Sequence, residues 1–406
     1  MAGIRWSWEL PDCSMPIAID TYSRCSYNCL YCFSFFKPMF RRKEKEISML
    51  SPDGVMKHFD GSRESVFSPF LEKKMFVQWG GITDPFDEYE RKYGKTLELM
   101  KKLKELDYPL SFSTKGTWWT QDKRYTDLIK DQKNWYFKIS IINLNAELSA
   151  KIELGAPSPQ ERIRALERIA KLNCGYPILR LRPYIIGMSN KNGEDLKLIR
   201  QAGKAGAKAI STEFMCLDQR MNDRLEKRMN QLSEALGFNI MRFYRKNSVG
   251  DGYLRLSREN KRDIVMGMKA EAEAQGMKFY CSDAHWKDTN CNGSCCGLPK
   301  SANYFKAQMT EMIVKAREQG KISWEDFKAE MPAEYKTMKF VDLEGINLGS
   351  LQGKATKINM TTEDWLREKW NSINSKAGLL KAYARVLEPI GSKKGNVVYK
   401  YRGIKK

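Results

Sequence analysis

Short apolar runs alternate with amphipathic stretches along the first half of the chain. Six of the runs are rich in β-branched and aromatic residues, and we expect them to form strands over residues 16–22, 75–79, 109–114, 136–142, 178–186 and 208–215. The stretches between them place apolar residues at helical spacing, most clearly after Ser158, which stands at an N-cap position with Pro159 and Glu161 in the first turn. Strands that alternate with helices are typical of βα units and a parallel sheet. The pattern therefore predicts an α/β fold, as a barrel or an open sheet.

Polar residues occur at alternate positions of several predicted strands, although a sheet covered on both faces has strands that are apolar throughout. The residues that share this trait are Lys115, Lys138, Ser140, Arg180, Arg182, Tyr184, Ser211 and Glu213. Residues two apart in a strand lie on the same face, so one face of the sheet is polar and charged. A lumen that holds a ligand explains this face, and we favour it. Buried pairs that satisfy one another, such as Arg182 with Glu213, are the alternative.

The second half of the chain is mainly helical. We expect helices over residues 218–236 and 256–275, an irregular metal-held loop over 279–299, and a short β-like piece at 396–401. The chain thus divides into three expected parts, which are a barrel domain (1–216), a helical extension with the metal loop (217–300) and a basic, mainly helical C-terminal region (301–406).

Composition adds a strongly basic surface to this picture. The chain has 70 Lys and Arg residues against 49 Asp and Glu, a net charge of +21 over 406 residues, which favours a polyanion such as nucleic acid as a partner. A basic surface kept for solubility is the alternative. No stretch approaches the ~18 apolar residues of a membrane span, and residues 1–11 lack the apolar core of a signal peptide. We therefore expect a cytoplasmic protein without a membrane partner.

The first of two cysteine groups directly follows the first predicted strand. Cys25, Cys29 and Cys32 have the spacing CxxxCxxC. Three thiolates in one short loop can hold a 4Fe–4S cluster and leave its fourth iron open to a substrate or cofactor. A zinc site would need a further ligand, and the two histidines of the chain, His58 and His285, are both distant in sequence. The spacing therefore favours an iron–sulfur cluster.

This motif, at the start of a βα series, resembles that of the radical SAM superfamily, whose members use S-adenosylmethionine (SAM). The resemblance implies a partial (β/α)6 barrel, SAM bound to the open iron, and reductive cleavage of SAM to a 5′-deoxyadenosyl radical that abstracts hydrogen from a substrate. It also implies an electron donor such as flavodoxin or ferredoxin. By its position in the motif, Tyr31 would pack on the adenine. The turn at Gly80 and Gly81, followed by Thr83 and Asp84, would hold the methionyl amine.

A closer resemblance is to the spore photoproduct lyase branch of this superfamily. It is carried by residues 81–85, Thr114-Lys115, Ser140, residues 153–159 and Glu161-Arg162. It implies that Lys115 and Ser140 contact SAM, and Arg182 and Glu213 of the polar lumen complete the expected cofactor site. Gly81 stands where the lyase keeps its hydrogen-donor cysteine, so thymine-dimer repair is not implied. The candidate hydrogen donors in this chain are Tyr184, Cys174 and Cys216.

The second cysteine group lies in the expected metal-held loop. Cys281, Cys291, Cys295 and Cys296 fall within sixteen residues that include several small ones, which let the backbone fold tightly around a metal. Four thiolates would close an auxiliary 4Fe–4S cluster. Because two of the cysteines are adjacent, three ligands with Asp283 or His285 as a fourth, or a zinc site, remain open. A disulfide fits a cytoplasmic protein least.

These features predict an enzyme that acts on a nucleobase in DNA, with a modified thymine as the leading substrate. Phosphate contacts suit the basic charge, base stacking suits the 10 Trp and 18 Tyr residues, and a duplex base would have to be flipped out to reach a radical inside a barrel. One version is a rearrangement in viral DNA hypermodification. The alternatives are radical modification of a peptide or small metabolite, and a non-enzymatic DNA-binding protein with structural clusters, which predicts no SAM binding.

Overall fold

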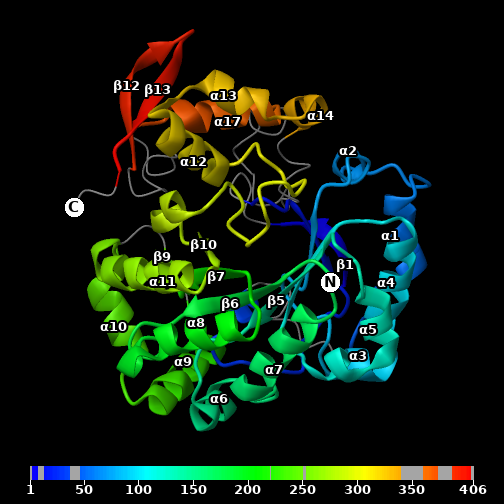
Figure 1. The fold of residues 1–406 in the computed structure, drawn as a ribbon. Helices are drawn as coiled ribbons and strands as arrows, with labels where there is room; N and C mark the ends of the chain where they lie inside the picture. The colour runs from blue at the N-terminus through cyan, green and yellow to red at the C-terminus, as the bar shows by residue number, and fades with distance from the viewer. Residues whose placement is uncertain are drawn as a thin grey trace. The chain divides into compact units, whose positions relative to one another are not determined.

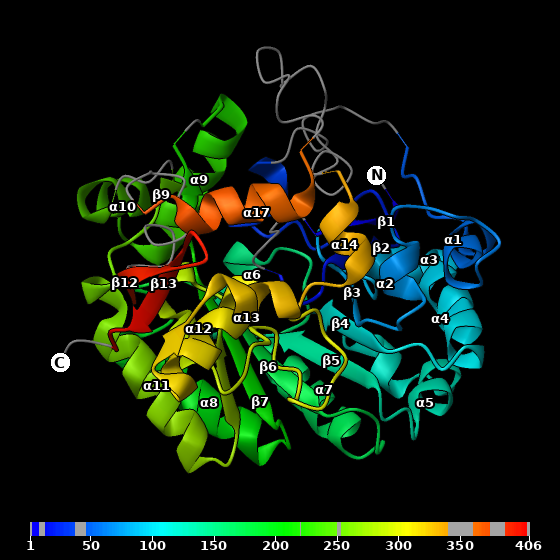
Figure 2. The ribbon, with the colours of Figure 1, turned by 90° about the horizontal axis from the view of Figure 1, so that it is seen from above.

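A computed structural model describes residues 2–7, 13–36, 46–219, 221–249, 253–339, 360–373 and 386–403. Within these residues the largest sheet has eight strands in the order β1-β2-β3-β4-β5-β6-β7-β10 (Figures 1 and 2). The strands are β1 (Gly3–Trp6), β2 (Ile17–Asp20), β3 (Val77–Trp79), β4 (Leu110–Thr114), β5 (Trp135–Ser140), β6 (Pro177–Tyr184), β7 (Ala209–Phe214) and β10 (Lys278–Cys281). Neighbouring strands follow the chain order, which is the arrangement that successive βα units produce.

All six predicted strands are present, as β2 through β7. The pairs β4–β5, β5–β6 and β6–β7 are parallel, with Ser113 opposite Lys138 and Arg180 opposite both Ser140 and Ser211. The sequence does not predict the flanking strands β1 and β10, which have four residues each. The irregular loop expected from residue 279 is wrong at its start, because residues 279–281 belong to β10. A short antiparallel pair, β8 (Leu217–Asp218) and β9 (Tyr253–Leu254), lies outside this sheet.

Helices connect the strands and cover the sheet. They are α1 (Pro52–Phe59), α3 (Glu88–Tyr93), α4 (Lys95–Glu105), α5 (Lys123–Ile129), α6 (Ala146–Ile152), α7 (Pro159–Ala170), α8 (Glu194–Lys204), α9 (Asp223–Leu236), α10 (Ile240–Asn247) and α11 (Arg262–Ala274). Both views show α4, α5, α7, α8 and α11 along one side of the sheet (Figures 1 and 2). Ser158 caps α7 as predicted and accepts a hydrogen bond from the Glu161 N–H at 3.2 Å. The helical stripe with Leu166 and Ile169 is buried.

Aromatic rings pack against one side of the sheet. Phe112 of β4 stacks on Trp79 and Phe137, with ring centroids 5.3 and 4.8 Å apart, and all three side chains are fully buried. Such stacking adds to the free energy gained by burying large apolar surfaces. Ser111 and Ser113 flank Phe112 along the strand and therefore face the opposite side of the sheet. One side is apolar core and the other is polar, as the alternation of residues predicts.

The chain divides into two compact units. The first comprises residues 1–4, 19–56 and 78–279, and the second comprises residues 5–18, 57–77 and 280–406. The second unit contains α2 (Ser68–Leu71), α12 (Met309–Gln319), α13 (Trp324–Ala329), α14 (Ala333–Thr337), α17 (Thr362–Asn371) and an antiparallel sheet β11-β13-β12 (Lys321–Ile322, Asn396–Tyr401, Leu387–Lys393). The predicted β-like piece at 396–401 is β13, whereas the division into three parts stays a prediction. No helix in the described part of the chain is long and apolar enough to cross a membrane.

Candidate functional site

The three cysteines of the first group lie in one loop directly after β2. Cys29 is buried, with 6% of its surface exposed, and Cys25 and Cys32 are half-buried. Asn28 has a φ of 44°, a left-handed conformation that asparagine tolerates better than most residues, and it turns the backbone between the first two cysteines. The Cys32 N–H donates to the Cys29 carbonyl at 3.1 Å. These two features turn the backbone back on itself between Cys25 and Cys32.

The segment at the end of α6 forms a bed for this loop. The Leu30 N–H donates to the Ile152 carbonyl at 2.8 Å, and the Gly155 N–H donates to the Tyr27 carbonyl at 3.1 Å. A Cβ on Gly155 would lie 2.8 Å from the Ser26 carbonyl oxygen, closer than a Cβ atom normally comes to another heavy atom. Glycine at this position allows the close approach of the two segments.

The loop is also tied to the start of α3. The Ser26 N–H donates to the Asp87 carboxylate at 2.7 Å, and the Tyr27 hydroxyl donates to the Phe86 carbonyl at 3.1 Å. Asp87 is itself the N-cap of α3, where it accepts from the Tyr89 N–H. Burial raises the pKa of the Asp87 carboxyl to about 7, although the hydrogen bond from Ser26 acts in the opposite direction.

Arg228 of α9 holds the loop from a third direction. Its Nη1 donates to Asn28 Oδ1 at 3.0 Å, and its Nη2 donates to the Asn28 and Cys29 carbonyls at 3.1 and 2.6 Å. The guanidinium also lies 3.9 Å from the ring centroid of Phe35. Sequence reasoning missed this residue. The signal that could have found it is an arginine on the otherwise apolar stripe of α9, between Leu225 and Leu232.

A buried carboxylate lies beside the aromatic residue of the cysteine motif. Glu153 Oε1 accepts a hydrogen bond from the Tyr31 hydroxyl, and Glu153 Oε2 lies 2.5 Å from Arg162 Nη2 and accepts from the Ser149 hydroxyl at 2.7 Å. Burial alone would raise the pKa of Glu153, but Arg162 and then Lys115 lower it to about 2. Tyr31 is therefore fixed by an ionised group, and its contact with the adenine stays a prediction.

Lys115 lies at the end of β4 and faces the same network. Its Nζ is 4.0 Å from Glu153 Oε1 and 5.7 Å from the ring centroid of Tyr31. Burial raises the pKa of the Cys29 thiol to about 12, whereas the Lys115 ammonium acts to lower it. The structure thus brings Tyr31, Lys115 and Cys29 together, and Arg162 adds Ser140, whose carbonyl accepts from Nη1 at 3.0 Å.

The glycine turn after β3 is held by a residue that the sequence does not single out. Gly80 has a φ of 87°, and a Cβ there would lie 2.4 Å from the Ser113 carbonyl oxygen, so glycine is required. Asp20 Oδ1 accepts from the Ile82 and Thr83 N–H groups at 2.8 and 3.0 Å. Gly81, directly before Ile82, is half-buried. An acidic residue at the last position of β2 is the signal that could have pointed to this turn.

The two polar side chains of the turn bond to the protein. The Thr83 hydroxyl donates to the Tyr22 carbonyl at 3.0 Å. Asp84 accepts from the Thr114 hydroxyl and the Lys115 N–H, both at 2.6 Å. Asp84 therefore positions the backbone of Lys115, and direct contact of Thr83 or Asp84 with SAM stays a prediction.

The polar face of the sheet contains both an ion pair and unsatisfied groups. Arg182 Nη2 lies 2.5 Å from Glu213 Oε2, and about a fifth of each side chain is exposed, so the pair that the sequence offers as an alternative does form. The hydroxyls of Ser111 and Ser113, both buried, make no hydrogen bond among the described residues. Buried polar groups normally have a partner. This face therefore has both the charge and the free polar groups that a ligand-binding lumen needs.

The three candidate hydrogen donors are in different settings. Tyr184 departs from the alternation of β6, because the register shifts between Leu181 and Tyr184, and its hydroxyl donates to Asp195 of α8 at 2.6 Å. Cys174 precedes β6, whereas Cys216 follows β7. In a parallel sheet all strands begin at one end of the sheet and finish at the opposite end. Cys216 therefore lies at the same end as Lys115, where the strands finish, and Cys174 lies at the end where they begin.

The second cysteine group lies in a closely bonded loop of the second unit. Cys281, Cys295 and Cys296 are buried and Cys291 is exposed, and all four are free thiols. The buried amide of Asn290 accepts from the Cys281 N–H at 2.5 Å and donates to the Cys281 carbonyl at 3.0 Å. The Cys295 and Cys296 sulfur atoms are 4.0 Å apart. The backbone of the loop is thus ordered by its own side chains, with three thiols inside.

The two groups differ in how they fit a metal. No three His, Cys, Asp or Glu side chains in the described part of the chain converge on one point as ligands of a single ion. A 4Fe–4S cluster does not require this, since each thiolate binds a different iron. The first group fits such a cluster in its donor set and in its surroundings, where Arg228 Nε is buried without an acceptor among the described residues. A buried donor of this kind is suited to an anionic group.

Comparisons with known proteins bear on the fold. No protein-family model matches the chain. Uncharacterized proteins of Mycobacterium bovis and Mycobacterium tuberculosis are 26% identical over 235 residues, which is 53% of this chain and 66% of theirs, so the chain spans slightly less than two thirds of their length. Two mutants of spore photoproduct lyase align with a TM-score of 0.50 and 14% identity, over 68% of this chain and 78% of the lyase. The chain has the partial-barrel fold of that enzyme, and the fold predicted from the cysteine motif is confirmed.

Proposed function

We propose that this chain is a radical SAM enzyme. Cys25, Cys29 and Cys32 would hold a 4Fe–4S cluster with one open iron, and bound SAM would supply a 5′-deoxyadenosyl radical after the cluster takes an electron from a donor such as flavodoxin or ferredoxin. The observation that carries the proposal is the cysteine loop itself. Hydrogen bonds hold it on three sides, and its Tyr31 ring lies beside Lys115. We propose that the protein works in the cytoplasm.

The residues near the loop divide the work of holding the cofactor. Tyr31, fixed through Glu153, offers an aromatic face to the adenine. Lys115 carries a positive charge that suits the carboxylate of SAM, and its backbone is held by Asp84. The turn at Gly80 offers backbone carbonyls to the methionyl amine, with Ser140 as a further contact.

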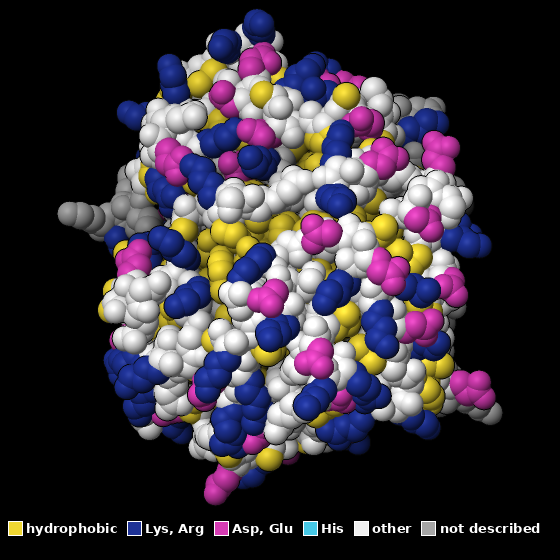
Figure 3. Space-filling model, turned by 45° about the vertical axis from the view of Figure 1, so that its right-hand side comes forward, with side chains coloured by type: hydrophobic (Ala, Val, Ile, Leu, Met, Phe, Trp, Pro, Cys, Tyr) yellow, Lys and Arg dark blue, Asp and Glu magenta, His cyan; other side chains and the backbone are white. Residues whose placement is uncertain are grey.

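For the substrate we propose a nucleobase in DNA, with a modified thymine as the leading candidate. The net charge of +21 supports a polyanion, and Figure 3 shows Lys and Arg side chains spread widely over one face of the molecule. The Arg182–Glu213 pair on the polar face, with about a fifth of each side chain exposed, supports a polar ligand in the lumen. A peptide or small metabolite is the competing substrate class.

The decisive experiment uses the full-length protein, reconstituted with iron and sulfide without oxygen. Dithionite and SAM should yield 5′-deoxyadenosine, and Cys29→Ser should abolish this product because one iron ligand is lost. Cys13→Ser is the matched control, since the Cys13 thiol donates to the Met15 carbonyl, a bond that a serine hydroxyl can keep, and this variant should leave cleavage unchanged. If the Cys29→Ser variant cleaves SAM as well as the unmodified protein, the proposal is wrong.

A second experiment separates the substrate classes. SAM cleavage is measured with thymine-modified DNA, with a peptide library and with neither, and deuterium transfer from each substrate into 5′-deoxyadenosine is followed by mass spectrometry. The DNA proposal expects enhancement and transfer only with DNA, and its binding should weaken with salt because phosphate contacts release counterions. Transfer from a peptide would instead favour the competing class.

For the second cysteine group we propose an auxiliary 4Fe–4S cluster. Three buried thiols in an ordered loop support it. The 4.0 Å between the Cys295 and Cys296 sulfur atoms is close to the ~3.8 Å between two thiolates on one tetrahedral ion with 2.3 Å bonds. Thiolates on different irons are farther apart, so one cysteine of this pair at most serves as an iron ligand, together with Cys281 and Cys291.

A further inference from the structure

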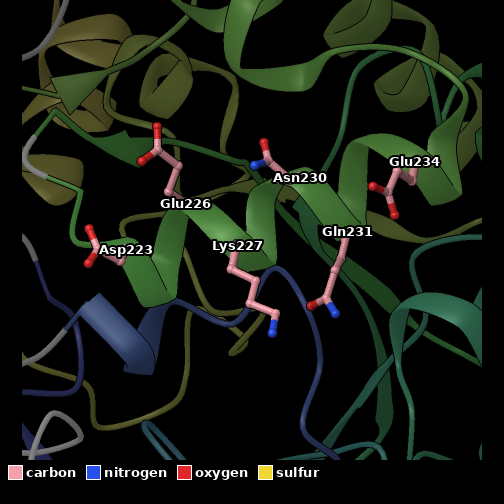
Figure 4. A pocket seen from close by; sticks show the side chains of 6 residues that line it. All are labelled: Asp223, Glu226, Lys227, Asn230, Gln231 and Glu234. Carbon is pink, nitrogen blue, oxygen red and sulfur yellow. The ribbon is translucent and has the colours of Figure 1, made fainter.

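Arg228 is the charged residue among the four buried residues of α9, a helix whose outer face is fully polar. Figure 4 shows Asp223, Glu226, Lys227, Asn230, Gln231 and Glu234 along the outside of α9, where they line a shallow groove. Arg228 lies on the inner stripe of the same helix with only 9% of its surface exposed. Burying a guanidinium costs free energy unless it is paired or well hydrogen-bonded. Its position therefore calls for an explanation.

The hydrogen bonds of Arg228 fix the peptide groups around Cys29. The carbonyl of Cys29 accepts from Nη2 at 2.6 Å, while the N–H of the same peptide group, on Leu30, donates to Ile152 at 2.8 Å. The preceding carbonyl, on Asn28, accepts from Nη2 at 3.1 Å. Nη1 donates to the Asn28 side chain while Nη2 donates to both carbonyls, so the planar fork of the arginine holds the loop through two nitrogens. The peptide group between Cys29 and Leu30 is thus held through both its carbonyl and its N–H. These two bonds fix the backbone from which the Cys29 thiol extends.

The charge of Arg228 has no carboxylate partner among the described residues, since its bonds go to amide and carbonyl oxygens. The other buried arginine near the loop, Arg162, is neutralised by Glu153 at 2.5 Å. The acidic residues of α9 lie on its outer face (Figure 4). A full positive charge is therefore directed at the loop of the first cysteine group in a setting where water screens it little.

We infer that Arg228 is a positioning residue that fixes the loop and, through its charge, raises the reduction potential of the cluster at Cys25, Cys29 and Cys32. This inference rests on the proposed function. Reduction adds one electron to the cluster and makes it more negative, so a nearby cation stabilises the reduced form, and net charge and hydrogen bonding are known determinants of such potentials. Arg228 Nε, buried without an acceptor among the described residues, adds a donor on this side.

The test is a redox titration of the reconstituted full-length protein, read from the electron paramagnetic resonance signal that Cys29→Ser removes. Arg228→Gln removes the charge, Arg228→Lys keeps it, and Lys227→Gln removes an equal charge from the outer face of the same helix. We expect Arg228→Gln to make the cluster harder to reduce. Its reduction potential should fall by about 59 mV, which is a tenfold change in the equilibrium constant for adding one electron. Arg228→Lys and Lys227→Gln should stay near the unmodified protein.

The outcomes separate this inference from the proposed function. If Arg228→Gln and Lys227→Gln give the same potential, the inference is overturned while the proposed function stands. If the unmodified protein binds no cluster that depends on Cys29, the proposed function itself fails. Where Arg228→Gln yields no folded protein by circular dichroism, Arg228→Lys decides. A lysine has one nitrogen in place of the two that reach Asn28 Oδ1 and the two carbonyls, so iron uptake should fall, and unchanged uptake would overturn the positioning role.

Discussion

Glu153 and Arg162 form an ion pair with 2.5 Å between oxygen and nitrogen, and only 1% of either side chain is exposed. The pair joins three elements, because Tyr31 of the cysteine loop donates to Glu153 and Arg162 of α7 donates to the Ser140 carbonyl at the end of β5. It therefore couples the stability of the barrel wall to the position of the residue predicted to contact the adenine.

Arg162→Met should destabilise the protein by about 3–5 kcal/mol. The change removes the nearest cation of the buried Glu153 carboxylate and the hydrogen bond that it donates, and Lys115, at 4.0 Å, lies beyond hydrogen-bond distance. Denaturation by urea measures the change. Arg164→Met is the control, because Arg164 pairs with Glu161 at the surface and should cost about 1 kcal/mol or less. Equal losses in the two variants would contradict the prediction.

The same pair predicts a pH dependence. The pKa of Glu153 in the folded protein is about 2, below the ~4.3 of an unfolded chain, so its contribution to stability is present above pH ~4.3 and is lost as the pH falls toward 2. Glu153→Gln removes this titration. Unfolding midpoints at pH 3 and pH 6 should therefore differ less in Glu153→Gln than in the unmodified protein, and an identical difference in both would refute the argument.

Local patterns predicted much of the fold. The six central strands and the cap at Ser158 depend on alternation and on residues adjacent in sequence, so one segment at a time was enough to find them. The CxxxCxxC spacing located the candidate site for the same reason. The contacts that complete the site could not be found in this way, because Arg228 meets the cysteine loop across 199 residues and Asp20 meets Thr83 across 63. Such pairs are decided by how the sheet closes.

Tyr184 illustrates a second limit of sequence patterns. Strict alternation places it on the same face as Arg182, but the register shifts before it and its hydroxyl reaches Asp195 in α8. A break in register reverses the face of every residue beyond it. Alternation therefore identified the polar face correctly up to Arg182 and Glu213. It placed Tyr184, two residues after Arg182, on the wrong face.

Gly155→Ala should lower cluster loading without unfolding the barrel. The added Cβ would lie 2.8 Å from the Ser26 carbonyl oxygen, so the cysteine loop must move away from the segment that follows α6. We expect iron bound after reconstitution to fall by about half or more, while the circular dichroism spectrum is unchanged. Gly267→Ala is the control, since Gly267 is in helix α11 with open space around it and alanine there should stabilise by about 0.5–1 kcal/mol. Full loading of Gly155→Ala would show that the loop tolerates the shift.

The second cysteine group makes a prediction that depends on the 4.0 Å between Cys295 and Cys296. If each 4Fe–4S cluster binds, the protein should contain about eight irons per chain. If one of the adjacent thiolates is an iron ligand, as we propose, one of Cys295→Ser and Cys296→Ser should keep about eight irons and the other should fall to about four. Elemental analysis by mass spectrometry measures the iron and zinc bound per chain. About four irons with one zinc in the unmodified protein would instead mean that the pair binds a single tetrahedral ion, and a chelator should then lower the unfolding temperature, because binding of a structural metal contributes to folding.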